Sequence, residues 1–242
     1  MFKHKMKFNY LFSLNIFWIF FNSSQINMIV FYIMYFIFFG LGIGLGYHRI
    51  VCHDVKVNST VSKIFVWLGF LCHVGSVKGS IVWHTQHHTH SGTDHDLKRS
   101  FLTALSPKLS KVKIPKKILV RVLKKYEENK FYYLLDKYFY LVFMFSYFLL
   151  YWLFGFSDLV HYFLAPAALA LIIHSYSPYF VHSFGYQNYV SEDNSWNSIW
   201  TFPILFGENW HNNHHHAPGR FNFQIKKYEI DLIYFVGRLF RQ

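Results

Sequence analysis

Nine of the 16 histidines lie where their spacing could direct several imidazole nitrogens toward one point. The clusters at 84–88 and 211–215 each place histidines at positions i, i+3 and i+4, which share one face of an α-helix. We therefore expect two helix faces, each carrying three imidazoles, that meet around a small volume. The nine candidates are His48, His53, His84, His87, His88, His182, His211, His214 and His215.

Imidazole nitrogens are good ligands for iron, zinc, copper and nickel, so this pattern predicts metal binding. Nine candidates are more than the coordination sphere of one ion holds, which favours two ions. His48 and His53 are five residues apart and would lie roughly 140° from each other around an ideal α-helix. They either serve different metals or lie where a helix breaks. Cys52 and Cys72 show no spacing typical of a thiolate zinc site or of a disulfide framework.

The elements that position these histidines are those of a membrane protein. Apolar residues make up 53% of the chain and aromatic residues 22%, whereas charged residues are only 15%. A soluble domain carries about 25% charged residues. The composition excludes a disordered chain and argues against a soluble globule. The length of 242 residues suits one domain, and we expect residues 1–242 to form a single one.

Uncharged apolar runs predict an all-α protein with four membrane spans in two hairpins. A spanning helix needs about 20 mostly apolar residues, and the run 26–46 meets this length. The shorter run 8–21 follows three lysines, and we interpret it as a retained first span rather than a cleaved signal peptide. The runs 138–156 and 159–177 form the second predicted hairpin.

Two further apolar stretches are interpreted differently. The stretch 64–82 is interrupted by His73, Lys78 and glycines, and we expect a helix at the membrane surface or buried against the others, not a fifth span. The glycine-rich run 40–46 lies inside a predicted span with no strand before it. Its glycines therefore indicate close helix packing rather than a nucleotide-binding loop.

The net charge of +12 is concentrated in three segments: +3 at 1–9, +7 at 83–130 and +2 at 205–242. Four spans place these segments on one side, which the positive-inside rule makes cytoplasmic. We expect both termini and the histidines there, with residues 47–137 and 178–242 forming a helical cap. The lysines of 83–130 would contact lipid headgroups or an anionic acyl carrier, and nucleic acid is disfavoured.

The histidine clusters and their neighbours resemble those of the membrane-bound fatty acid desaturases, most closely the acyl-CoA (stearoyl-CoA, Δ9-type) branch. The spacings H-x4-H, H-x2-HH and H-x2-HH match the family's three boxes. The sequences GIGLGYHR at 42–49, HSFGY at 182–186 and GENWHNNHH at 207–215 match the surrounding motifs. The resemblance extends over about 36–240.

This resemblance implies two iron ions held by the nine histidines on a cap above four membrane helices. The implied reaction removes two hydrogens from adjacent methylenes of an acyl chain with O2 and two electrons. The substrate would be an acyl-CoA, an acyl carrier or an acyl-lipid, and the electrons would come from a separate ferredoxin or cytochrome b5 type of donor. Three places depart from the family pattern: Pro178 replaces a water-holding asparagine, Leu97-Lys98 replaces Pro-His, and Trp196 replaces an arginine.

Two other functions use the same residues. A hydroxylase or another oxygenase on the same diiron scaffold differs from a desaturase only in its product. A histidine-rich membrane metal transporter or storage protein would carry polar residues along its spans as an ion path, and the predicted spans offer only His161 and His174.

Overall fold

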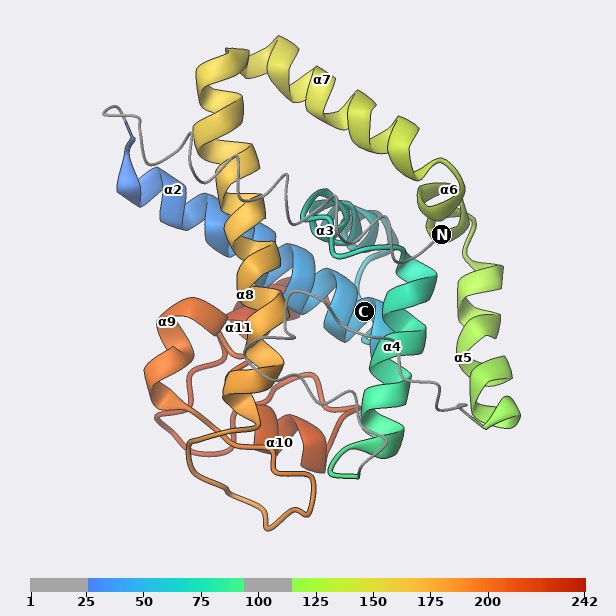
Figure 1. Cartoon of the computed structure of the whole chain (residues 1–242), viewed down its shortest axis with the longest axis vertical. Helices are drawn as coiled ribbons and strands as arrows, with labels where there is room; N and C mark the ends of the chain where they lie inside the picture. The colour runs from blue at the N-terminus through green and yellow to red at the C-terminus, as the bar shows by residue number, and fades with distance from the viewer. Residues whose placement is uncertain (1–25, 94–114) are drawn as a thin grey trace.

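The computed structural model describes residues 26–93 and 115–242, which form helices joined by loops (Figure 1). Within these residues, β-type pairing is limited to isolated bridges such as that between Tyr186 and Asn197, so the predicted helical class is confirmed. The first helices are α2 (Met28–Tyr35), η1 (Phe36–Cys52), α3 (Ser59–Leu71), α4 (Val77–His90), α5 (Lys116–Glu128) and α6 (Lys130–Lys137). They are followed by α7 (Phe139–Asp158), η3 (Leu159–Leu164), α8 (Ala165–Val181), η4 (Ile199–Thr201), α9 (Phe202–Leu205), α10 (His211–His216), α11 (Leu232–Gly237) and η5 (Arg238–Phe240).

Two of the described helical segments are long and apolar enough to cross a membrane, Met28–Cys52 and Phe139–Val181. The second bends sharply at Gly155, whose φ of 78° interrupts the helical backbone, and Figure 1 shows its two arms diverging from this point. These arms contain the predicted spans 138–156 and 159–177. The predicted span 8–21 lies outside the described residues.

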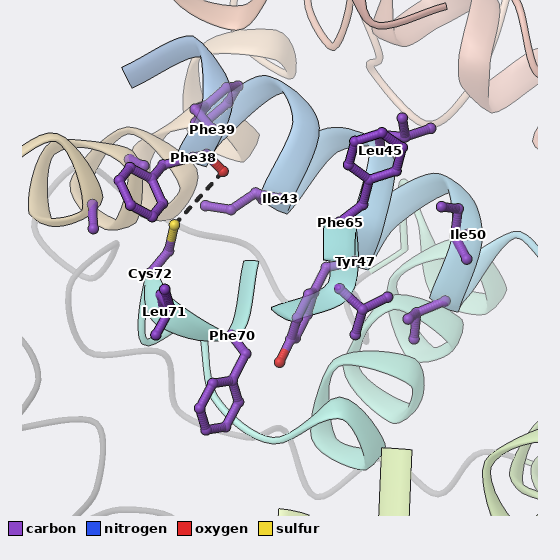
Figure 2. Packing of buried hydrophobic residues seen from close by; sticks show 14 of the residues in the cluster. Phe38, Phe39, Ile43, Leu45, Tyr47, Ile50, Phe65, Phe70, Leu71 and Cys72 are labelled. Atoms are coloured by element: carbon purple, nitrogen blue, oxygen red, sulfur yellow. Dashed lines mark hydrogen bonds between the residues drawn. The ribbon is translucent and has the colours of Figure 1, made fainter. Parts of the chain in front are cut away.

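The helix pair η1 and α3 forms the centre of the core (Figure 2). A Cβ on Gly42 would lie 2.7 Å from the backbone nitrogen of Gly69, and one on Gly46 would lie 2.4 Å from the carbonyl oxygen of Phe65. The two backbones therefore touch without side chains between them. The interpretation of the glycine-rich run as close helix packing is confirmed.

The apolar stretch 64–82 is two helices rather than the single one expected. α3 ends at Leu71 and α4 starts at Val77, and between them His73 and Gly75 have φ angles of 59° and 111°. Left-handed backbone of this kind cannot continue a right-handed helix. The break turns α4 away from α3, and α4 is the helix that carries the second histidine cluster.

The outer face of α7 exposes large apolar side chains. Leu141, Met144, Phe148 and Trp152 are each more than 60% exposed. A contiguous apolar face of this kind is costly in water and is typical of a surface that meets lipid or another protein. Together with the two apolar segments, this face supports a membrane location.

We predict that Gly46→Ala destabilises the protein by about 1–3 kcal/mol, because the new methyl group would push α3 away from η1. The measurement is the thermal unfolding midpoint in detergent. Gly219→Ala is the matched control, since no atom of the described residues lies within 4 Å of a Cβ at that position. Equal midpoints for the two variants would contradict the close packing of these helices.

Candidate metal centre

The structure gathers all nine candidate histidines into two groups. Within each group the ligand nitrogens lie within 4.8 Å of one another. The first group contains His48, His53, His84, His88 and His214, and the second contains His87, His182, His211 and His215.

In both groups the Nε2 atoms face one another across short separations. In the first group the Nε2–Nε2 distances are 3.2 Å for His48 and His214, and 3.0 Å for His88 and His214. His53 and His84 are closer, at 2.6 Å. In the second group the distances are 3.1 Å for His87 and His215, and 3.0 Å for His182 and His211.

Two helices supply histidines to both groups. On α4, His84 and His88 join the first group, and His87 joins the second. On α10, His214 joins the first group while the i, i+4 pair of His211 and His215 joins the second. The predicted faces are present, and each is divided between two neighbouring groups.

Of the two alternatives for His48 and His53, the structure shows the end of a helix rather than two different metal groups, and the separation expected on an ideal α-helix does not apply because η1 is a π-helix. The backbone N–H of His53 donates to the carbonyl oxygen of His48 at 3.1 Å, which is the i to i+5 bond of a π-helix. Residues five apart therefore lie one above the other. His53 also directly follows the end of η1, and both side chains enter the first group.

Burial and the nearby histidines favour the neutral form of several of these imidazoles. Burial lowers the pKa of His182 to about 4, and the neighbouring His87 and His215 contribute to this shift. The pKa values of His84 and His214 are lowered well below the usual range, first by burial and then by adjacent histidines. Neutral imidazoles are the form that binds metal ions.

Two carboxylates fix the orientation of the His215 and His48 rings by pairing with their Nδ1 atoms. Asp193 Oδ2 lies 2.6 Å from His215 Nδ1, and Glu208 forms the equivalent pair with His48 Nδ1. A ring that donates from Nδ1 presents an unprotonated Nε2 to the centre of its group. Neither carboxylate was predicted from the sequence. Glu208 lies three residues before His211, but Asp193 lies 18 residues before it, so only the fold shows that both acids contact histidines.

Electrostatics keep these two acids ionised. Burial alone would raise the pKa of Glu208, but its interactions with His48 and Arg49 together outweigh this and lower it below its usual value. Burial likewise opposes ionisation of Asp193, but its interactions with His215 and the hydrogen bonds from Ser191 and Ser195 together outweigh burial and lower the pKa.

Arg49 joins the first group to the C-terminal segment. Its buried guanidinium donates to Glu208 Oε1 at 3.1 Å and to Asp231 Oδ2 at 2.9 Å, and it lies 3.9 Å from the centre of the Phe223 ring. A buried arginine between two carboxylates is strongly held, since removal of any partner leaves an unpaired buried charge. Arg49 thus holds the Glu208 that orients His48.

A network of amides positions α10, which carries three of the nine histidines. Asn197 Oδ1 accepts from the backbone N–H groups of Asn212 and Asn213 at 3.1 Å and 3.3 Å. Asn213 Nδ2 in turn donates to Glu229 Oε2 at 3.0 Å. The first turn of this short helix is therefore held by side chains from two loops, which explains the asparagines between the histidines.

The donor sets fit metal ions. Two ligand nitrogens bound about 2.0–2.1 Å from one ion, at tetrahedral or octahedral angles, are about 2.9–3.4 Å apart. Four of the five Nε2 separations above fall in this range. Unprotonated nitrogens that face one another repel unless a cation lies between them, so the arrangement suits two metal ions.

A cavity of about 540 Å³ reaches both groups. His48, His84, His87 and His211 form part of its wall. Apolar side chains of η1 and α8 continue the wall away from the histidines, and α4, α5 and α6 contribute polar side chains elsewhere. Pro178 of α8 also lines the cavity, at the position where the resemblance implies an asparagine.

The other histidines stay outside both groups, as far as the structure describes them. His73 packs against Phe143. Both His73 and His174 line the cavity. His216 stacks on Tyr189 with ring centres 3.6 Å apart. His4 and His95 lie outside the described residues.

The chain is similar to several characterised enzymes, although no family model matches it. It is 32% identical over 226 residues to an sn-1 stearoyl-lipid 9-desaturase of Anabaena variabilis, covering 86% of this chain and 78% of that protein. It is 30% identical to an sn-2 palmitoyl-lipid 9-desaturase of Nostoc sp. (strain 36), covering 88% and 77%. Delta-9 acyl-lipid desaturase 1 of Arabidopsis thaliana is 27% identical, covering 82% and 67%.

We predict that Asp193→Asn weakens metal binding about 10- to 100-fold, because His215 loses the charged partner that orients its ring. The dissociation constant for Co²⁺, followed by its visible absorption, measures this change. Glu192→Gln is the matched control, since it removes the same charge from the neighbouring exposed position. Identical affinities for the two variants would show that Asp193 has no part in metal binding.

Proposed function

The chain belongs to the membrane-bound fatty acid desaturase family, and we propose that it forms a double bond in a fatty acyl chain by O2-dependent removal of two hydrogens from adjacent methylenes. The observation that carries this proposal is the pair of histidine groups on the wall of one cavity. Its relatives are named 9-desaturases, which supports carbons 9 and 10 as the site of the reaction.

The nine histidines would hold two iron ions, five imidazoles around one and four around the other. Iron bound there would activate O2 for hydrogen removal from an unactivated C–H bond, which no acid or base of the chain can perform. Asp193 and Glu208 hold protons at Nδ1 of His215 and His48, so that Nε2 stays free to bind.

The cavity provides the place for the acyl chain. Phe39 and Ile43 of η1 and Leu171 of α8 line it away from the histidines, and an apolar wall of this kind favours a hydrocarbon over water. Exclusion of water beside the metal centre also protects a reactive site from side reactions. The residues therefore bind the chain, orient it past the histidines and keep solvent out.

Several finer assignments are part of the proposal. The names of the relatives favour a lipid-bound acyl chain as the substrate, and an acyl-CoA or an acyl carrier is the second candidate. A separate ferredoxin or cytochrome b5 type of protein supplies the electrons. Four spans with both termini and the histidines on the cytoplasmic side agree with the three basic segments of the sequence.

Product analysis tests the reaction directly. Expression in a host of known lipid profile should yield a fatty acid two hydrogens lighter, with the double bond located by mass spectrometry. His87→Ala and His214→Ala should each abolish this product while the protein stays in the membrane, because each removes a ligand from one group. His216→Ala is the matched control, since it lies next to His215 but in neither group.

Product formation by both ligand variants would show that the histidine groups are not the active site. A hydroxylated fatty acid in place of an alkene would instead identify an oxygenase on the same scaffold.

The purified protein should contain about two irons per chain. Removal of iron with a chelator should abolish desaturation, and Fe²⁺ should restore it, because the neutral histidines are free to bind again. Elemental analysis of the active protein measures the metal content. Zinc as the only metal in active protein would contradict the diiron site.

A further inference from the structure

The segment before the histidine cluster at 211–215 exposes large apolar side chains. Its helices η4 and α9 follow one another from residue 199 to 205, and no residue from 199 to 206 is charged. Trp200 is 88% exposed, and Ile199 and Ile204 are also exposed. Figure 1 shows α9 at the outer edge of the molecule, on the same side as α2. An indole exposed to this degree contributes little to the core, and the desaturation reaction does not use it.

Hydrogen bonds attach α9 to the side of α2. The hydroxyl of Tyr32 donates to the carbonyl oxygen of Pro203 at 2.6 Å. One turn further along α2, the hydroxyl of Tyr35 donates to the carbonyl oxygen of Ile204 at 2.8 Å. Both tyrosines belong to the first half of the apolar segment Met28–Cys52, which is long enough to cross a membrane. The short helix α9 therefore lies beside a candidate span.

The exposed side of α2 continues the apolar surface of α9. Ile29 and Ile33 of α2 are both exposed. The Phe206 ring joins the two helices, since its centre lies 5.7 Å from that of Tyr32 and 4.9 Å from that of Phe36. A surface that is continuous with a membrane-spanning helix meets the same lipid as that helix.

The backbone of this segment also suits an environment without water. A carbonyl group that lacks a hydrogen-bond donor is costly in lipid, and a short helix leaves its last carbonyl groups without intrahelical partners. Here the carbonyl oxygens of residues 202–206 each accept a hydrogen bond from the protein. The donors are the Phe206 N–H for Phe202, the tyrosine hydroxyls for Pro203 and Ile204, the Glu208 N–H for Leu205 and the Ile233 N–H for Phe206. The segment thus needs no water to satisfy these groups.

We propose that residues 199–206 insert into the lipid bilayer beside α2 and attach the loop of the third histidine cluster to the membrane. Tryptophan is enriched where lipid head groups meet acyl chains, which suits the exposed Trp200. Glu208, which pairs with His48, follows the segment by two residues, and His211 follows it by five. Insertion therefore fixes the height of the metal centre relative to the bilayer. It also places part of the predicted cytoplasmic segment 178–242 within the membrane.

The test measures the surroundings of residue 200 with a nitroxide label on Trp200→Cys, in the full chain reconstituted in phosphatidylcholine nanodiscs. Collisions of the label with O2, which concentrates in the bilayer, are compared with collisions with nickel ethylenediaminediacetate, which stays in water. Trp152→Cys on the outer face of α7 and Val190→Cys in the loop after α8 are the matched references, because both native side chains are also highly exposed. The unchanged protein, with its free Cys52 and Cys72, gives the background signal.

The ratio of O2 to nickel collisions at residue 200 should be several-fold higher than at residue 190 and close to that at residue 152, because an inserted label lies at the boundary of the acyl chains. A ratio equal to that at residue 190 would overturn the proposal, since residue 200 would then face water. Few collisions with both reagents would also overturn it, because protein would then cover this surface.

Fluorescence provides a second measurement that needs no added cysteine. The difference between the unchanged protein and Trp200→Phe isolates the emission of Trp200. Brominated acyl chains should quench this emission strongly, whereas iodide in the water should quench it little. Quenching by iodide and not by the brominated lipid would contradict insertion. Neither measurement depends on turnover, so a chain that desaturates no substrate still tests the membrane insertion.

Discussion

Unprotonated imidazole nitrogens that face one another across about 3 Å repel, and this chain gathers nine imidazoles in two groups of that kind. A proton cannot easily relieve the repulsion at His84 and His214, because burial and the neighbouring histidines hold their pKa values low. A cation can, and iron is the ion that the proposed reaction requires. The surrounding hydrogen bonds and ion pairs hold the imidazole rings in position for metal binding.

Those interactions come from segments far apart in the chain. Glu208 orients His48, Arg49 holds Glu208, and Asp231 holds Arg49 in turn. This series ties η1 to the loop before α10 and to the start of α11. Asp193, in the loop between α8 and η4, orients His215 of α10. Buried charged groups are costly unless paired, so each pair fixes the position of its neighbours.

The sequence predicted much of the site because metal ligands on helices follow simple spacing rules. The triplets at 84–88 and 211–215 lie on α4 and α10, as their i, i+3 and i+4 pattern indicated. Spacing could not show that each triplet is divided between two groups, since this depends on how the helices cross. Nor could it find Asp193 or Glu208, whose partners become neighbours only through tertiary structure. The break between α3 and α4 was missed because a histidine and a glycine inside an apolar stretch also occur within continuous helices, so they did not identify the break at His73 and Gly75.

The π-helical form of η1 shows how local backbone cost and distant packing are linked. In an α-helix His48 and His53 would diverge, whereas the i to i+5 bond brings both into the first group. π-helices are rare and frequently occur at functional sites. Here the same helix carries Gly42 and Gly46, which allow the α3 backbone to approach closely along its length. The close contact between the two helices gains dispersion attraction. The glycine-rich run and the first histidine box are adjacent in sequence and lie on the same helix. The glycines pack η1 against α3, and this packing positions His48.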